Sequence, residues 1–167
     1  MSKPLPPVRL VIASLMLALA GCTLPSGAMA GCNAGEEKGT SVAGLDQVTL
    51  CIASGKKVRP FTVEVARSTQ QQAQGLMFRE ELADDAGMIF PFPQPRPASF
   101  WMKNTIVSLD LLFIRKDGTI ESIAENAVPY STDPMTSQGA VAAVLELRGG
   151  LTSELGIKAG DKVAWEK

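Results

Sequence analysis

Residues 109–124, with the sequence LDLLFIRKDGTIESIA, decide the fold because they predict a β-hairpin. The run Leu109–Arg115 is apolar on both faces except at Asp110, a pattern that is typical of a strand covered on both sides. Asp117-Gly118 favours a tight hairpin turn, because glycine and aspartate tolerate the backbone angles that such a turn needs. A return strand is expected to begin at Ile120.

The alternation of apolar and polar residues recurs on both sides of this hairpin. We predict further strands at residues 48–52, 61–66, 87–90, 99–105, 140–148 and 162–166, and short helices at 70–76 and 151–155. Short strands therefore dominate, and the fold class expected is mainly β, that is α+β with short helices. We expect a compact, mainly antiparallel, β-barrel-like single domain over residues 47–167, with barrel closure favoured over an open sheet.

A proline-rich segment, PFPQPRP at residues 91–97, interrupts these strands. Its four prolines stand at alternate positions, and each lacks the N–H group that a central strand would use. We therefore predict an extended, polyproline-like loop here.

The first residues predict export. Lys3 and Arg9 precede an apolar run from Leu10 to Ala20, which is too short to cross a bilayer and is typical of a secretory signal. Residues 19–22, LAGC, resemble a lipobox, which would make residues 1–21 the signal peptide and Cys22 the lipidated N-terminus. The alternative is cleavage after Ala30, at the sequence AMA. The first reading predicts a periplasmic lipoprotein anchored to the outer membrane, and the second a soluble periplasmic protein.

Residues 22–46 are rich in small and polar residues and predict a flexible tether. Cys32 and Cys51 remain under either cleavage and are expected to form a disulfide, because exported proteins fold in an oxidising compartment. The alternative is a buried thiol at Cys51 and a free one at Cys32.

Composition excludes several classes of function. The chain of 167 residues contains no histidine, which rules out histidine-dependent triads and histidine zinc sites. Its 16 basic and 17 acidic residues argue against a strongly basic nucleic-acid binder. The sequence also lacks a Cys-x-x-Cys pair, a glycine-rich phosphate loop and a nucleophile elbow. We expect no cofactor, no metal and no nucleic-acid partner.

Several segments together carry a resemblance to a known family. They are GLMFR (75–79), GMIF (87–90), FWMKNT (100–105), LDLLFI (109–114), VLEL (144–147) and GIKAGD (156–161). In this order they resemble the domain-of-unknown-function 192 family of bacteria and archaea, over about residues 58–167. Ser108 departs from the pattern, since many members carry proline there. The resemblance implies a small, mostly β domain that is often exported, and it implies no established activity.

Four residues are candidates for ligand binding. Trp101 and Lys103 lie two apart on a predicted strand and would share one face, offering an apolar platform beside an ammonium group. Such a pair suits a sugar ring or an anionic ligand. Arg79 and Asn104 complete the candidate set. The alternative is structural: Trp101 packs in the core while Lys103 extends outward, and Asn104 braces a turn.

Two carboxylates are weak candidates for catalysis. Asp110 and Glu146 each interrupt an apolar strand, and they could act as an acid/base pair if they converged. A buried Asp110 would need a partner, for which Arg79, Lys103, Arg148 and backbone amides are candidates. The methionines that follow the leader could bind Cu(I), but their spacing favours core packing; they are Met77, Met88, Met102 and Met135.

The function favoured by these observations is that of a non-catalytic envelope domain. It would bind a small polar ligand, a glycan or a protein partner near Trp101, Lys103 and Arg79. The alternatives are a carboxylate-dependent hydrolase or lyase, and a purely structural accessory domain of the envelope.

Overall fold

The computed structural model describes residue 29 and residues 31–165. The predicted signal peptide, Cys22 and Ala30 lie outside the described residues. Within them, no helix has the length and apolar character needed to cross a bilayer.

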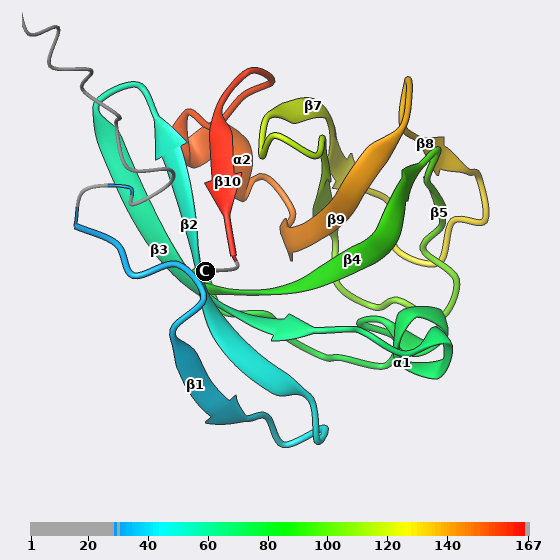
Figure 1. Cartoon of the computed structure of the whole chain (residues 1–167). Helices are drawn as coiled ribbons and strands as arrows, with labels where there is room; N and C mark the ends of the chain where they lie inside the picture. Colours follow the sequence, from blue (N-terminus) through cyan, green and yellow to red (C-terminus); the bar gives the residue numbers. More distant parts are fainter. Residues whose placement is uncertain (1–28, 30, 166–167) are drawn as a thin grey trace, which may run out of the picture.

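One mixed sheet of eight strands forms the domain, in the order β1-β2-β3-β4-β9-β6-β7, with β10 paired to β2 (Figure 1). These strands are β1 (Glu37–Thr40), β2 (Asp46–Ser54), β3 (Lys57–Val65), β4 (Ala86–Arg96), β6 (Leu109–Ile114), β7 (Ile120–Ala127), β9 (Val141–Arg148) and β10 (Lys162–Ala164). A separate two-stranded sheet pairs β5 (Ser99–Phe100) with β8 (Met135–Thr136). The helices are α1 (Thr69–Gln74) and α2 (Leu151–Leu155). The mainly β class and the two short helices are confirmed.

One pair of strands departs from the antiparallel prediction. β3 and β4 are parallel, with Val63 opposite Gly87, whereas the other pairs are antiparallel. A parallel pair needs a long crossover connection, which α1 and the loop after it supply. α1 begins one residue before the predicted helix and ends two residues earlier than predicted, and the side chains of its N-cap Ser68 and of Gln71 form a reciprocal capping box.

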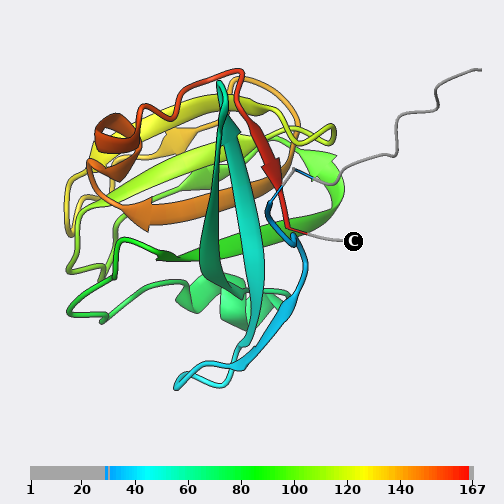
Figure 2. The ribbon, with the colours of Figure 1, turned by 90° about the vertical axis from the view of Figure 1, so that its left-hand side faces the viewer.

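The sheet curls into a barrel-like form without closing (Figure 2). The turn of the β6–β7 hairpin approaches β10 through one isolated bridge, between Thr119 and Lys162. Gly118 makes this approach possible, because a Cβ atom there would lie 2.5 Å from the carbonyl oxygen of Val163. The N–H of Val163 donates to that glycine's carbonyl oxygen at 2.8 Å. The predicted closure of the barrel is therefore wrong, and one isolated β-bridge joins the two ends of the sheet instead.

The proline-rich segment corrects our prediction, because most of it belongs to β4. Pro91 lies opposite Ala143 of β9, and Arg96 lies opposite Val141, with an irregular register between them. Alternate residues of a strand direct their backbone groups to the same edge, so the missing N–H groups need not interrupt the pairing with β9. β3 pairs with β4 only as far as Ile89, and the carbonyl oxygen of Pro91 accepts a hydrogen bond from Gln72 of α1 instead.

The predicted tether also contains structure. The strand β1 lies within residues 22–46 and pairs with the start of β2, although all residues of β1 are exposed. Backbone hydrogen bonds to β2 hold this strand, so it needs no large apolar side chains. Cys32 forms the predicted disulfide with Cys51, and the two Cα atoms are 6.1 Å apart. The disulfide therefore fixes the segment before β1 to a core strand.

We expect removal of this disulfide to cost about 3 kcal/mol of unfolding free energy, the value for a loop of this length in the chain-entropy model. The change is Cys32→Ala, which leaves the fully buried Cys51 in the core. Denaturant unfolding of the oxidised protein and of the variant measures the difference. A reductant should destabilise the parent protein and leave the variant unchanged; equal stability of the two proteins would contradict the prediction.

Buried side chains form two clusters, one on each face of the central strands. Ile89, Leu112 and Leu145 belong to the first cluster, which also contains Leu151 of α2. The second cluster includes Leu76 just after α1. The two helices lie on opposite sides of the β4–β9 pair in Figures 1 and 2. The second face carries the site described next.

Candidate functional site

A pocket of about 340 Å³ opens on the second face, between α1 and strand β4. The turn after α1 contributes one part of its wall, and Phe90 and Phe92 of β4 contribute another. Phe100 and Trp101 extend the apolar lining, and Glu146 of β9 also lines the space. We call this space the Glu146 pocket. Its size is at the lower end of the range for small-molecule sites, about 300–1,000 Å³.

Glu146 is the exceptional residue of the pocket. It lies between Met88 of β4 and Leu111 of β6 in the sheet register, and only 5% of its surface is exposed. Within the described residues, no side chain or backbone group forms a hydrogen bond or ion pair with its carboxyl group. Burial without a partner disfavours the charged form and raises the pKa of Glu146 to about 8. At neutral pH the group is therefore an uncharged acid that can donate a hydrogen bond into the pocket.

Aromatic contacts hold the pocket wall in place. The rings of Phe90 and Phe100 meet edge to face, with centroids 5.1 Å apart and planes at 84°. Gly75, which ends α1, adopts a positive φ of 49°, and a Cβ atom there would lie 3.4 Å from the ring of Phe90. The positive φ, and not the distance to the ring, is what favours glycine at this helix end.

Two cations accompany the aromatic lining. The guanidinium of Arg96, which lines the pocket, lies 3.9 Å from the ring centroid of Phe92. The ammonium of Lys103 lies 5.4 Å from the ring centroid of Trp101. No carboxylate within the described residues pairs with either cation. Both therefore remain available to an anionic ligand.

The contact between Trp101 and Lys103 arises by a route that differs from our prediction. The strand β5 ends at Phe100, and the chain then turns, with the N–H of Thr105 donating to the carbonyl of Met102. Met102 is buried and anchors this turn in the second cluster. Trp101, however, is 52% exposed, so the alternative in which it packs in the core is wrong.

Arg79 and Asn104 do not line the Glu146 pocket. The guanidinium of Arg79 binds both carboxylate oxygens of the buried Glu64, at 2.8 and 3.0 Å, and so neutralises that carboxylate. Asn104 adopts a positive φ of 58° and donates from its amide to the sulfur of Met77 at 3.8 Å. These contacts agree with the alternative in which Asn104 stabilises a turn, and not with a role in the lining of the pocket.

The two carboxylates proposed as an acid/base pair point to opposite faces of the sheet. In the pairing of β6 with β9, Glu146 lies opposite Leu111 and Asp110 lies opposite Leu147. Successive residues of a strand point to opposite faces, so the side chains of Glu146 and Asp110 lie on opposite sides of the sheet. This geometry contradicts convergence of the pair.

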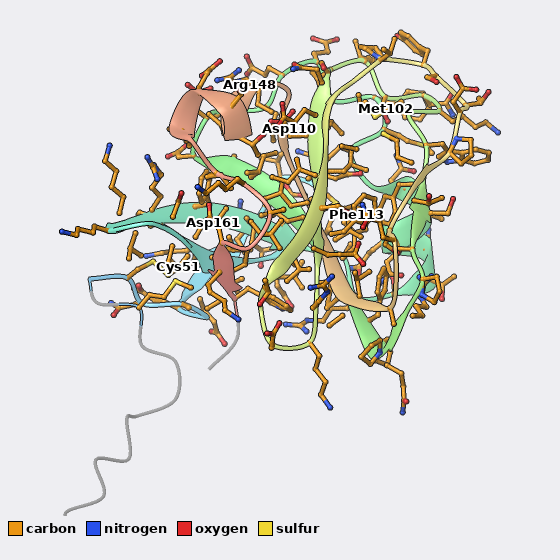
Figure 3. All side chains as sticks on the ribbon, turned by 90° about the horizontal axis from the view of Figure 1, so that it is seen from above. Cys51, Met102, Asp110, Phe113, Arg148 and Asp161 are labelled. Atoms are coloured by element: carbon orange, nitrogen blue, oxygen red, sulfur yellow. A yellow bond between two sulfur atoms is a disulfide. The ribbon has the colours of Figure 1, made fainter. Side chains whose placement is uncertain are left out.

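Asp110 instead holds the start of α2, beside which it lies in Figure 3. Its buried carboxylate accepts hydrogen bonds from the N–H groups of Asn126, Gly150 and Thr152, and from the hydroxyl of Thr152. Of the partners that we considered, the backbone amides are therefore correct and the basic side chains are not. Arg148 pairs with Asp84 and Glu154. Asp110 thus belongs to the scaffold.

The methionines fit the packing interpretation. Met88 and Met102 are buried in the second cluster, against which Met135 packs. Met77 lines the Glu146 pocket and accepts the hydrogen bond from Asn104. Among residue 29 and residues 31–165, no group of three or more histidine, cysteine, aspartate or glutamate side chains could hold a metal ion.

Sequence reasoning missed most of the pocket lining. Phe90, Phe92 and Arg96 lie next to the prolines of residues 91–97. The proline pattern predicts the conformation of the backbone there, and it does not indicate that the neighbouring side chains line a pocket. A signal did exist at Glu146, since it is a lone carboxylate in an apolar strand. We identified the residue but assigned it the wrong partner.

Comparison with known proteins supports the family and the fold. The model of the DUF192 family, described as an uncharacterized ACR, matches residues 50–165. No protein of curated function matches the chain significantly. A crystal structure of a protein of unknown function from Novosphingobium aromaticivorans DSM 12444 is 45% identical, with a TM-score of 0.75, and covers 77% of this chain and 92% of its own.

A crystal structure of a putative transcription regulator from Sinorhizobium meliloti 1021 is 42% identical, with a TM-score of 0.70. It covers 71% of this chain and 93% of its own. The family match extends over nearly the whole of the ordered sheet and confirms the resemblance seen in the sequence motifs. The chain belongs to the DUF192 family.

Proposed function

We propose that this protein is an exported, non-catalytic binding module of the cell envelope, and that its site is the Glu146 pocket. The observation that carries the proposal is the carboxyl group of Glu146, which is buried without a protein partner and lines the pocket. Burial deprives a polar group of most of its contacts with water, which is unfavourable where no protein group replaces them. A ligand that hydrogen-bonds to Glu146 from the pocket would supply such a contact.

The lining favours binding over catalysis. Among residues 29 and 31–165, Glu146 is the one acidic residue that lines the pocket. Asp110 faces the other side of the sheet, and Glu64 is occupied by Arg79. General acid–base chemistry on a substrate usually needs a second group of matched pKa. The hydrolase or lyase alternative therefore loses the pair of carboxylates on which it rested.

Export is supported by the N-terminal sequence and by the Cys32–Cys51 disulfide, since disulfides persist in oxidising compartments. We place the protein in the periplasm, with a lipid anchor at Cys22 in the outer membrane, or as a soluble protein after cleavage at Ala30. Under the lipoprotein alternative, the nine residues between Cys22 and Cys32 allow a reach of about 30 Å when fully extended. The pocket would then act close to the membrane.

Trp101→Ala tests the site, and we expect it to abolish ligand binding while changing the unfolding free energy by less than about 1 kcal/mol, since the ring is half exposed. The measurement is thermal stability with and without small cyclic ligands: hexoses, hexuronic acids, nucleosides and phenylpropanoid acids and amides. Tyr130→Ala is the matched control, because Tyr130 is 61% exposed and does not line the pocket.

A ligand shift that is lost in Trp101→Ala and retained in Tyr130→Ala would support the proposal. Two other results would count against the site: a shift retained in both variants, or no shift for the parent protein with any of the ligands. Global unfolding of Trp101→Ala would contradict the placement of the ring on the pocket wall.

A further inference from the structure

We infer that the Glu146 pocket selects a small carboxylate ligand, in which one ring lies against the aromatic wall and the anionic group faces Arg96 and Lys103. This inference rests on the proposed function and names the class of ligand for the same site. Its support comes from the charges, the shape and the hydrogen-bonding groups of the pocket.

The charges around the pocket favour an anion. Arg96 and Glu146 are the charged or titratable residues that line it. Because Glu146 is uncharged at neutral pH, the lining carries a net positive charge, and Lys103 adds a second positive charge next to Trp101. Glu64, which lies on the same face of the sheet, is neutralised by Arg79. The helix α1 contains no charged residue, so it does not alter the balance.

Arg96 is free to bind a carboxylate. Its guanidinium lies over the ring of Phe92, and an aromatic ring contact of this kind does not use up the hydrogen-bonding capacity of the N–H groups. Within the described residues its side chain makes one hydrogen bond, a long one of 3.4 Å to the carbonyl of Pro97. An arginine edge matches the two oxygens of a carboxylate, and such pairs are among the stronger hydrogen-bonded contacts. The residue is exposed, so a ligand can reach it.

The shape of the pocket sets the size and apolar character of the ligand. A volume of about 340 Å³ holds one ring with a short substituent, and the lining is rich in aromatic side chains. Rings stack well on such walls. The half-exposed Trp101 offers the accessible face, and the buried Phe90 and Phe92 offer the deeper ones.

Glu146 adds a pH dependence to this selectivity. In its uncharged form it donates a hydrogen bond to the ligand, and in its charged form it repels an anion. Anion affinity is therefore expected to be high below the pKa of about 8 and to fall as the pH rises above it. A cationic ligand would show the opposite trend, since the ionised Glu146 would attract it.

Three probes of one shape and different charge test the inference: 3-phenylpropionate, 3-phenylpropionamide and 3-phenylpropylammonium. Calorimetry with the purified protein at pH 6.5 and pH 9.5 gives their affinities. We expect 3-phenylpropionate to bind at least tenfold more tightly than the other two at pH 6.5, and to lose about 30-fold at pH 9.5, which lies 1.5 units above the pKa. The affinity of the amide corrects for other effects of pH.

Two variants assign the effect to residues. Glu146→Gln should retain the preference for the carboxylate and abolish its loss at pH 9.5. Arg96→Gln should remove roughly tenfold of the preference at pH 6.5. If Glu146→Gln does not fold, the ratio of carboxylate to amide affinity in the parent protein still decides the question. Glucuronate and N-acetylphenylalanine, measured in parallel, distinguish a sugar acid from the carboxyl end of a peptide.

The outcomes separate this inference from the proposed function. Tighter binding of the ammonium probe, increasing with pH, would overturn the inference and leave a binding pocket in place. Trp101-dependent binding of an uncharged sugar or nucleoside, with no binding of the carboxylates, would do the same. If no ligand binds in a Trp101-dependent manner, both the inference and the proposed function fail.

Discussion

Glu146→Gln is expected to stabilise the protein by about 4–5 kcal/mol at pH 9 and to leave its stability nearly unchanged at pH 4. In the unfolded chain this carboxyl has a pKa of 4.5, and in the folded protein burial raises the value to about 8. Between these values the folded state holds a proton that the unfolded state has released. The parent protein therefore loses about 1.4 kcal/mol per pH unit across this window.

Glutamine has the shape of the protonated acid and does not titrate. The unfolding free energy of the variant therefore does not fall as the pH rises through this window. Denaturant unfolding at pH 4, 7 and 9 measures the effect, with about 70% of it already present at pH 7. Glu125→Gln, at an exposed position of β7, is the neutral control. Glu64→Gln should act in the opposite direction at pH 7, because it leaves Arg79 without its carboxylate. A difference between Glu146→Gln and the parent that is the same at every pH would contradict the prediction.

Asp110→Asn is expected to cost about 3–5 kcal/mol, because it places an amide where two oxygens accept four hydrogen bonds. The donors come from the end of β7 and from the start of α2, and the carboxylate of Asp110 and the side chain of Thr152 are fully buried, so water cannot easily replace these bonds. Thr152→Val, which removes one of the four donors, should cost about 1–2 kcal/mol.

Chemical unfolding at pH 7 gives these values, and Asp133→Asn at an exposed position is the matched control. If Asp110→Asn had the stability of the parent protein, the role of Asp110 in holding α2 would be wrong. That result would also return Asp110 to the set of residues available for chemistry.

The elements that sequence predicted well are those with local causes. The β6–β7 hairpin follows from Asp117-Gly118 and the alternation around it, and the start of α1 follows from the Ser68–Gln71 capping box. The disulfide follows from the two cysteines that remain after the leader. Each of these depends on residues that are adjacent in sequence or on a count of one residue type.

The elements that sequence missed depend on partners distant along the chain. The prolines of β4 are tolerated because β3 no longer pairs with that stretch, a fact of topology and not of composition. β1 exists because β2 offers a free edge, and residues with no apolar content can pair with it. The parallel pairing of β3 with β4 likewise requires knowledge of where α1 packs.

The sequence identified some residues of the candidate site but not their arrangement. Trp101 lines the pocket and Lys103 contacts its ring, but they do so across a turn and not along a strand. Glu146 was identifiable as an unusual carboxylate, whereas its isolation from every partner depends on the register of three strands. Only that register shows Asp110 on the opposite face.

Direct titration of Glu146 tests the central claim, that an uncharged acid without a protein partner lines the pocket. The measurement is the chemical shift of the side-chain carboxyl carbon in glutamate-labelled protein from pH 3 to pH 10, with Glu146→Gln identifying the signal. We predict a midpoint near pH 8, set by burial. A midpoint near the ordinary value of 4.5 would contradict the account, because the group would then be charged at neutral pH and the pocket would repel an anion.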